Sequence, residues 1–317
     1  MNEFSLIEKY FKIPALSRDD VVFGIGDDAA CLASPVDKHL VVSTDTLVAD
    51  VHFLSTWDAY DIACKAVMVN VSDIAAMAAK PCWITLALTL PEIEQSWLER
   101  FAKGFHDSLR QFDLALIGGD TTKGPLSITI TIFGLVPIAK ALRRSGAKPG
   151  DKIYVSGDLG AAAQAVAFLH EDRISNEERQ VLMQKLQHPK PRVDLAEILR
   201  DYASSAIDIS DGLSADLNHI CVASGVGALL RAKAIPVHSL VKKYQAKNAV
   251  SFAISGGDDY ELCFTVPVQN EKRLIARLEK VGLSCYPVGV IEENSGLRMI
   301  AETGEICDLT PLGYSHF

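Results

Sequence analysis

The most regular pattern in the chain is Ser127-Ile-Thr-Ile-Thr-Ile-Phe-Gly-Leu-Val136. Its isoleucines alternate with serine and threonine, and this period of two predicts a half-buried β-strand. On the N-terminal side we expect further strands at Val21–Ile25, Leu40–Ser43, Ile84–Leu90 and Leu114–Ile117. Helices are expected over about Ala59–Ala79 and Glu94–Phe112, the latter with one apolar stripe that contains Leu98, Phe101, Phe105 and Phe112. Strands and helices mix without strict β-α-β alternation, which favours the α+β class.

The composition changes around Pro137–Asp151, where the chain becomes polar and rich in turn-forming residues. We therefore divide the 317 residues into domains 1–138 and 149–317, a number of domains that suits this length. The second domain is expected to be α+β as well. Its expected strands are Lys152–Ser156, Ser205–Ile209, Ser251–Ile254 and Leu262–Val266 with a β-rich end, and its expected helices are Asn176–Gln187, Leu213–Ala223, Gln269–Val281 and two that begin near Gly160 and Arg192.

Composition and charge exclude several classes of protein. Hydrophobic residues make up 49% and charged residues 22%, as in globular proteins. The net charge is -9 and no run of Lys and Arg exceeds a pair, so no nucleic-acid partner is expected. The longest uncharged stretch has 16 residues, which is too short for a membrane span, and the acidic N-terminus is unlike a signal peptide. We expect a cytoplasmic protein whose seven scattered cysteines form neither a disulfide framework nor a zinc site.

One local pattern recurs five times: an apolar run, then Gly or Ser, then Asp. The five segments are Val22–Asp28, Val41–Asp45, Leu116–Asp120, Ile207–Asp211 and Ile254–Asp259. We expect each carboxylate to lie where a strand passes into a loop. Any one of them could form a turn or cap a helix. Five together would repel one another unless a cation neutralised them, and hard oxygen ligands suit Mg²⁺, Mn²⁺ or Ca²⁺.

Asp73 supports the metal hypothesis independently. In the expected helix Ala59–Ala79, the residues Ile62, Ala66, Val69 and Asp73 share one face that is otherwise apolar. A carboxylate buried there is costly unless it is paired or binds a metal. Alternatively, the helix bends or ends near Asp73, which then caps the next segment.

Clustered acids, Gly-Gly amides and a few cations (Lys123, Arg143, Arg144) suit a polyphosphate bound with Mg²⁺, although those cations could equally be solvated surface residues. The chain has no P-loop, no G-x-S-x-G and no evident Cys–His pair. His52 follows the Ser-Thr-Asp motif and is either structural or a substrate contact. If the acceptor is itself a phosphate, its oxygen is already anionic and the reaction needs no general base.

Ten motifs, in this order along nearly the whole chain, resemble the thiamine-monophosphate kinase family, in the superfamily of aminoimidazole ribonucleotide synthetase and selenophosphate synthetase. They are Glu3-Phe-Ser-Leu-Ile7, Gly24-Ile-Gly-Asp-Asp-Ala-Ala30, Ser43-Thr-Asp-Thr-Leu-Val48, His52-Phe53, Val69-Asn-Val-Ser-Asp-Ile-Ala-Ala-Met77, Leu116-Ile-Gly-Gly-Asp-Thr-Thr122, Arg144-Ser-Gly-Ala-Lys-Pro-Gly-Asp151, Asp208-Ile-Ser-Asp-Gly-Leu213, Gly256-Gly-Asp-Asp-Tyr-Glu-Leu262 and Gly313-Tyr-Ser-His-Phe317.

The resemblance implies ATP-dependent conversion of thiamine monophosphate to thiamine diphosphate, by direct in-line transfer with several Mg²⁺ ions. It implies a homodimer joined through the N-terminal sheets in a barrel-like interface, and a C-terminal domain that closes an active-site cleft. Carried over by motif, the metal ligands are Asp28, Ser43, Thr44, Asp45, Asp73, Asp120, Asp208 and Asp211. Of these, Asp45, Asp120 and Asp211 are the catalytic residues; Gly119, Asp120, Arg144 and Ser210 contact ATP; and His52, Asp258 and Tyr314 contact thiamine monophosphate.

One position departs from the family pattern, because the family more often has glutamate where this chain has the shorter Asp258. Two alternatives stay open: a sister synthetase of the same superfamily, and a non-catalytic acidic protein that binds metal or nucleotide. Selenophosphate synthetases carry a reactive cysteine in an N-terminal Gly-rich segment, whereas the first cysteine here is Cys31 and follows the aspartate pair. In the tail, Tyr314 and Phe317 could instead pin the terminus to the second domain.

Overall fold

The structure is a computed structural model that describes residues 3–12, 18–171 and 173–314. These residues divide into two compact units. Unit 1 contains the described residues up to Ile74 together with Ala79–Ala139, and unit 2 contains Ala75–Ala78 and the described residues from Lys140 onward. No helix among the described residues combines the length and the apolar character needed to cross a membrane.

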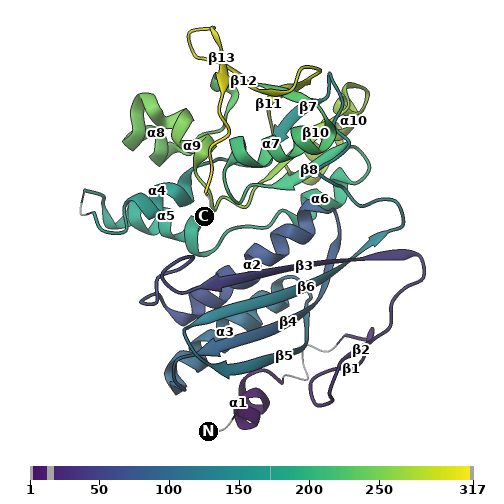
Figure 1. Cartoon of the computed structure of the whole chain (residues 1–317), viewed down its shortest axis with the longest axis vertical. Helices are drawn as coiled ribbons and strands as arrows, with labels where there is room; N and C mark the ends of the chain where they lie inside the picture. Colours follow the sequence, from purple (N-terminus) through teal and green to yellow (C-terminus); the bar gives the residue numbers. More distant parts are fainter. Residues whose placement is uncertain (1–2, 13–17, 172, 315–317) are drawn as a thin grey trace. The chain divides into compact units, whose positions relative to one another are not determined.

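Unit 1 is built on a four-stranded sheet of order β3-β6-β4-β5 (Figure 1). The strands are β3 (Lys38–Val48), β4 (Lys80–Leu90), β5 (Ala115–Lys123) and β6 (Ser127–Pro137), of which only β4 and β5 run parallel. The alternation noted in the sequence is the alternation of faces, since Ile128, Ile130 and Ile132 are completely buried and the threonines between them are not. The prediction of a strand over Ser127–Val136 is confirmed.

Two helices cover one face of this sheet, α2 (Ala59–Ala76) and α3 (Gln95–Gln111), and both lie behind it in Figure 1. The apolar stripe of α3 is buried at Leu98, Phe101 and Phe105, as predicted. The opposite face is partly covered by a small antiparallel pair, β1 (Val21–Phe23) and β2 (Cys31–Leu32), near β5, and we call it the uncovered face because neither α2 nor α3 packs on it. A further helix, α1 (Glu3–Tyr10), contacts α3 and β5.

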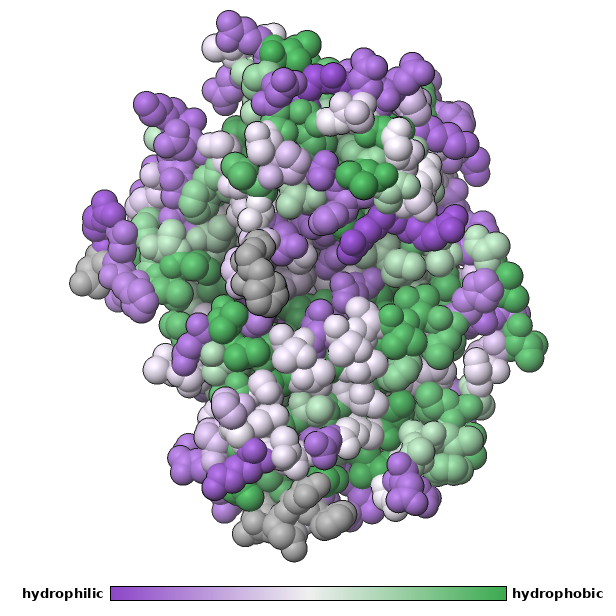
Figure 2. All heavy atoms as spheres, in the orientation of Figure 1, coloured by the Kyte–Doolittle hydropathy of each residue, from purple (hydrophilic) through white to green (hydrophobic). Residues whose placement is uncertain are grey.

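The uncovered face of the unit 1 sheet is weakly polar. In Figure 2, green and near-white side chains lie over the strands of this sheet. On β3, Leu40 and Val42 are 49% and 52% exposed. Thr44 and Thr46 hydrogen-bond across to Thr131 and Thr129 on β6 at 2.9 and 2.8 Å. Large apolar side chains are thus half exposed on a sheet face, where burial against another surface would be favourable.

Unit 2 contains a seven-stranded sheet of order β13-β12-β9-β11-β7-β10-β8, in which only the β12–β9 pair is parallel. Its strands are β7 (Lys152–Val155), β8 (Ser205–Asp208), β9 (Gly227–Arg231), β10 (Leu262–Val266), β11 (Tyr286–Glu292), β12 (Gly296–Ile300) and β13 (Ile306–Leu309). Its helices are α4 (Ala161–Ala167), α5 (Asn176–Gln187), α6 (Val193–Leu199), α7 (Leu213–Ser224), α8 (Ser239–Gln245), α9 (Ala249–Ser255) and α10 (Val268–Val281), with short 3₁₀ turns at Ala232–Ala234 and Ala246–Asn248.

Helices pack on both faces of the unit 2 sheet. Leu213 and Leu217 of α7 share a core with Cys263 on one face, while α6 and α10 pack on the other face around Phe264. Because successive residues of a strand point to opposite faces, a buried strand of this kind is apolar throughout. All five residues of β10 are accordingly buried. The mixed α and β content of both units confirms the α+β expectation at this level.

Two local predictions are wrong, and one alternative is excluded. Ser251–Ile254 lies in α9 rather than a strand; its buried residues Ala249 and Ala253 are four apart, and a short apolar run does not distinguish the two structures by periodicity. Asp45 and Asp120 lie within β3 and β5 rather than at strand exits, because both strands extend further than their apolar cores. Asp73 does not cap a bent or ended helix, since α2 continues to Ala76.

Candidate functional site

Unit 1 holds a pair of carboxylates where β3 faces α2. Ser43 donates its hydroxyl to Oδ2 of Asp73 at 2.5 Å. Burial, and then the negative charge of Asp73, raise the pKa of Asp45 to about 6. Thr44 points the other way, with its hydroxyl bonded to Thr131 on the uncovered face. The side chains of Ser43, Asp45 and Asp73 therefore form a small anionic centre on the helix-covered side.

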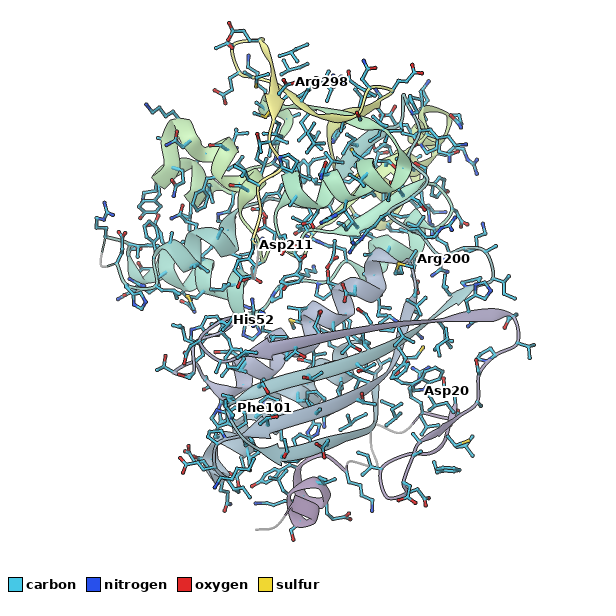
Figure 3. All side chains as sticks on the ribbon, viewed as in Figure 1. Asp20, His52, Phe101, Arg200, Asp211 and Arg298 are labelled. Carbon is cyan, nitrogen blue, oxygen red and sulfur yellow. The ribbon has the colours of Figure 1, made fainter. Side chains whose placement is uncertain are left out.

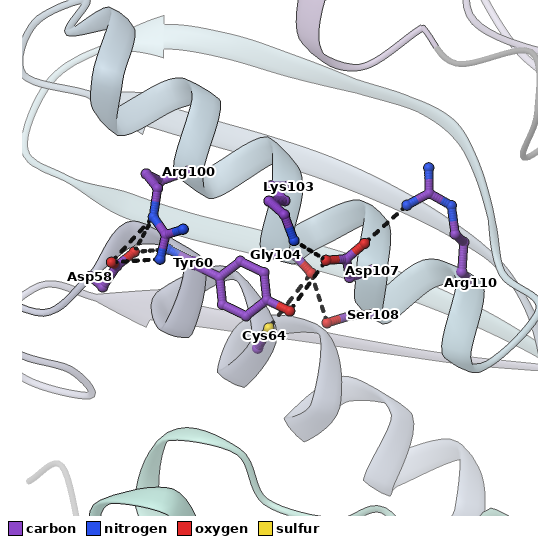
Figure 4. A network of polar contacts seen from close by, with 9 residues as sticks. All are labelled: Asp58, Tyr60, Cys64, Arg100, Lys103, Gly104, Asp107, Ser108 and Arg110. Carbon is purple, nitrogen blue, oxygen red and sulfur yellow. Dashed lines mark hydrogen bonds and ion pairs between the residues drawn. The ribbon is translucent and has the colours of Figure 1, made fainter.

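This centre depends on how α2 is held. At the start of α2, Asp58 accepts two-pronged hydrogen bonds from Arg100 of α3, and the Tyr60 hydroxyl donates to Asp107 (Figure 4). The two helices approach closely at Gly104, where a Cβ atom would lie 2.3 Å from the carbonyl oxygen of Tyr60. The contacts fix α2 along α3, and with it the position of Asp73 over β3.

His52 lies just beyond the end of β3 (Figure 3). Its ring Nδ1 accepts a hydrogen bond from the backbone N–H of Val48 at 3.0 Å, and its own backbone N–H donates to the Val48 carbonyl at 3.0 Å. The turn that follows β3 is thus closed by the histidine itself. These contacts hold the His52 ring at the C-terminal end of β3, the end that follows Asp45.

A second group of predicted site residues lines a pocket of about 970 Å³ on the uncovered face of unit 1. Asp28, Gly119 and Asp120 line it together with the apolar rings of Phe11 and Phe133. Gly119 cannot be replaced without moving the sheet, because a Cβ atom there would lie 1.9 Å from the Leu86 carbonyl oxygen. Backbone amides, two exposed carboxylates and an apolar wall are features of a nucleotide-sized pocket.

The two acidic groups of unit 1 lie at opposite edges of the sheet. The register pairs Asp45 with Ile130, Ile130 with Leu86, and Leu86 with Gly119. Three strand spacings of about 4.8 Å put the backbones of Asp45 and Asp120 roughly 14 Å apart. Within residues 3–12, 18–171 and 173–314, no group of three or more His, Cys, Asp or Glu side chains could hold a metal ion by itself.

Unit 2 brings four distant segments together at the exit of β8. Asp208 ends β8 and is buried, while Ser210 and Asp211 follow it and are partly exposed. The N–H of Asp258 donates to the Ser210 carbonyl at 2.8 Å, and the N–H of Tyr314 donates to the Asp211 carbonyl at 3.2 Å.

The polar segment 137–151 also contacts β8. The carbonyl of Arg143 accepts a hydrogen bond from the backbone N–H of Ala206 at 3.0 Å, and Arg144 is the next residue. Tyr314 itself is 53% exposed, and Phe317 lies outside the described residues. The residues predicted for metal and ATP in unit 2 are thereby linked, backbone to backbone, with those predicted for the acceptor.

Sequence reasoning missed Asp216, which shapes this exit. Its carboxylate accepts from the backbone N–H groups of Asp211 and Gly212, both at 3.1 Å. Burial raises the pKa of Asp216 to about 7 against the lowering effect of these hydrogen bonds. The sequence did contain a signal for Asp216. It lies with Leu213 and Leu217 on the buried side of α7, and a carboxylate on an apolar helix face is the criterion that selected Asp73.

The family comparisons cover both halves of the chain. Residues 26–136 match the family model of the AIR synthase related protein, N-terminal domain, and residues 148–302 match that of its C-terminal domain. The thiamine-monophosphate kinase of Escherichia coli (strain K12) is 46% identical over 320 residues, covering 99% of this chain and 98% of that protein. That of Bacillus subtilis (strain 168) is 32% identical over 326 residues, covering all of both chains.

Solved structures agree. The crystal structure of the thiamine-monophosphate kinase from Stenotrophomonas maltophilia K279a has a TM-score of 0.85 at 42% identity, covering 92% of this chain and 93% of that one. A structure of AaThiL complexed with AMPPCP and TMP has a TM-score of 0.78 at 31% identity, covering 99% and 96%. From this identity over nearly its full length, the chain belongs to the thiamine-monophosphate kinase family, within the AIR synthase related proteins.

Proposed function

We propose that this protein transfers the γ-phosphate of ATP to thiamine monophosphate and releases ADP and thiamine diphosphate. The relative AaThiL, crystallised with AMPPCP and TMP, supports an adenine nucleotide and a phosphorylated acceptor as the two ligands. The observation that carries the proposal is the exit of β8, where Ser210 and Asp211 hold the backbones of Asp258 and Tyr314 at 2.8 and 3.2 Å. The hydrogen-bonded segments at this exit thus include residues proposed for the nucleotide and residues proposed for the acceptor.

The residues of unit 1 fit Mg²⁺. Burial and the charge of Asp73 raise the pKa of Asp45 to about 6, and a divalent cation between the two carboxylates would offset their repulsion. Carboxylate and hydroxyl oxygens are also the donors that Mg²⁺ prefers. We assign Asp28, Ser43, Thr44, Asp45, Asp73 and Asp120 of unit 1 and Asp208 and Asp211 of unit 2 to metal binding. Thr44 would use its backbone carbonyl, since its hydroxyl bonds to Thr131 on the face opposite Asp45. When bound, Mg²⁺ supplies charge neutralisation on the phosphoryl oxygens.

The chain's own residues bind and orient the reactants. Gly119 and Asp120 in the pocket of unit 1, and Arg144 and Ser210 in unit 2, are proposed to contact ATP. His52, Asp258 and Tyr314 are proposed to contact thiamine monophosphate. Because the acceptor oxygen is anionic at neutral pH, no residue has to remove a proton from it. Holding the two phosphates in line is then the main catalytic task, as in other phosphoryl transfers, and the transfer is direct.

Catalysis by residues from both units requires unit 2 to close a cleft over unit 1, and we include this closure in the proposal. We also propose that the enzyme acts in the cytoplasm, where ATP is available.

We propose a homodimer formed through the uncovered face of the unit 1 sheet. Leu40 and Val42 are half exposed there, and a second copy would bury them in a barrel-like pairing of two sheets. A two-fold axis can pair the sheet edges in two ways, β3 beside β3 or β3 beside β5 of the partner. Only the second places the edge strand that carries Asp45 beside the partner's edge strand that carries Asp120, whereas within one chain two strands lie between them. The separation of roughly 14 Å therefore favours that pairing.

The test is an acceptor panel. Wild-type protein with ATP and Mg²⁺ is expected to release ADP with thiamine monophosphate and to release little with thiamine, thiamine diphosphate or no acceptor. Asp45→Asn and Asp120→Asn should lose nearly all of this ADP release, whereas Asp37→Asn, at an exposed acid just before β3, should keep it. ADP release that is independent of the acceptor would contradict the proposal. Binding of ATP without turnover would favour a non-catalytic nucleotide-binding protein.

A further inference from the structure

The 256–261 loop, between α9 and β10, has an unusual backbone. Asp258 and Tyr260 have φ angles of 68° and 49°, the left-handed region that residues other than glycine rarely adopt. Such conformations persist only where the surroundings hold them in place. The contacts that hold this loop therefore matter, since the proposed function needs Asp258 in one position.

The backbone of the loop is held from one side by the β8 exit. Besides the bond from Asp258, the N–H of Tyr260 donates to the Ile209 carbonyl at 2.8 Å, and the Glu261 carbonyl accepts from the Ile209 N–H at 2.7 Å. The fit is tight, because a Cβ atom at Gly257 would lie 2.5 Å from the Ser210 carbonyl oxygen. These contacts set the distance between the loop and the exit, but they leave the loop's other side to be held.

Two carboxylates that the proposed mechanism does not use hold that other side. Both oxygens of Asp259 accept from the backbone N–H of Gly160, at 3.0 and 2.8 Å. Glu261 is buried, accepts from the Ser156 hydroxyl at 2.5 Å and pairs with Arg192. Asp259 and Glu261 both contact the 156–160 segment, which leads into α4.

The Asp259 carboxyl group stays in place at a cost. Burial raises its pKa well above its ordinary range, and the negative charges of Glu261 and Asp158 add to this, while the Gly160 hydrogen bonds and Lys185 act in the other direction. Glu261 has the guanidinium of Arg192 as partner, but the contacts of Asp259 given by the structure are to a backbone amide. Because its surroundings disfavour the ionised form, this carboxylate contributes little to stability, and its hydrogen bonds to Gly160 are the more informative observation.

We propose that Asp259 is a positioning residue for the acceptor: by fastening the 256–261 loop to Gly160, it holds its neighbour Asp258 where thiamine monophosphate binds. This inference rests on the proposed function. It names a residue outside the sets proposed for metal, ATP and acceptor. It also assigns Gly160 a role, because that amide is the fixed point to which the loop is attached.

The test is a double-mutant cycle between Asp259 and Asp258 in the full-length protein. Asp259→Ala removes the acceptor of the Gly160 N–H, and we expect the KM for thiamine monophosphate to rise about tenfold. The KM for ATP should change less than about twofold, since the β8 exit keeps its own contacts. Asp259→Asn keeps one carbonyl oxygen at the same place, so its KM for thiamine monophosphate should stay close to that of the wild type. Asp258→Ala/Asp259→Ala should have the same KM as Asp258→Ala alone, because one residue acts through the other.

Glu271→Ala serves as the structural control. Glu271 accepts from the buried Tyr154 hydroxyl at 2.6 Å elsewhere in unit 2, and alanine removes this acceptor, so the variant should lower the melting temperature and leave both KM values unchanged. If Asp259→Ala does not fold, Asp259→Glu replaces it in the cycle, since one extra methylene displaces the loop while the charge is kept.

An unchanged KM for thiamine monophosphate, or effects of the two single variants that multiply in the double variant, would overturn this inference and leave the proposed function intact. A wild-type protein that does not phosphorylate thiamine monophosphate would overturn both.

Discussion

Replacing Asp45 by asparagine should make the metal-free protein more stable and the enzyme nearly inactive. The pKa of Asp45 is raised from 3.8 to about 6, chiefly by burial and then by Asp73. A carboxyl whose pKa is higher in the folded than in the unfolded state stabilises the fold only when protonated. Its contribution is lost as pH rises from about 4 to about 6 and does not return above that range. At pH 7.5 the full difference corresponds to about 3 kcal/mol, which we halve to about 1.5 kcal/mol because the side chain is only partly buried.

Removing the charge in Asp45→Asn should therefore raise the melting temperature of the metal-free protein by about 4 °C at pH 7.5. The increase should disappear near pH 4, where the wild-type carboxyl is protonated as well. Added Mg²⁺ and ATP should stabilise the wild type more than the variant, because stabilisation follows occupancy of the site. Thermal unfolding with and without Mg²⁺–ATP measures both effects, with Asp37→Asn as the charge-matched control. A variant that melts lower than wild type without metal, and keeps the full Mg²⁺–ATP shift, would refute the assignment of Asp45.

Three further predictions concern the dimer, the C-terminal tail and a buried histidine. If each site combines Asp45 of one subunit with Asp120 of the other, a mixed dimer of the inactive variants Asp45→Asn and Asp120→Asn has one wild-type site. Separating the subunits of the two variants and letting them re-form dimers together should therefore restore activity. No recovery would place both residues in one subunit's site. Tyr314→Ala should raise the KM for thiamine monophosphate about tenfold and spare that for ATP, because a planar ring can stack on the thiazolium; a large fall in melting temperature instead would mean that the tail is structural. Burial and then Arg110 lower the pKa of His106 to about 4, so between pH 7 and pH 5 only the unfolded histidine takes up a proton. As pH falls over this range, the free energy of unfolding of the wild type, measured in urea, should decrease by about 1 to 2 kcal/mol more than that of His106→Gln. Equal decreases in the two proteins would refute this.

Much of the fold follows from periodicity. Ile128, Ile130 and Ile132 identify β6, and Leu98, Phe101 and Phe105 identify α3, because each pattern matches the period of one secondary structure. Where the apolar signal is short, as at Ser251–Ile254, periodicity does not separate helix from strand. Periodicity also misses the part of β3 that contains Asp45. There the strand is maintained by backbone hydrogen bonds to β6, while its side chains become polar and give no apolar signal.

The candidate site was predictable in its residue types more than in its arrangement. The recurring Asp motifs selected Asp45, Asp120 and Asp211 as candidates, but strand order decides that Asp45 and Asp120 lie at opposite sheet edges. Nothing local in the sequence gives that order, since β6 enters between β3 and β4 from farther along the chain. In the same way, the bond between Tyr314 and Asp211 joins residues that only the folded unit 2 brings together.

The central claim is that thiamine monophosphate receives the phosphoryl group of ATP, and ³¹P NMR of the reaction tests it most directly. With wild-type protein, Mg²⁺, ATP and thiamine monophosphate, the phosphomonoester signal should decline as the two coupled resonances of thiamine diphosphate grow, in equal amount to the ADP formed. Consumption of ATP to ADP and inorganic phosphate, with the phosphomonoester signal unchanged, would contradict the account.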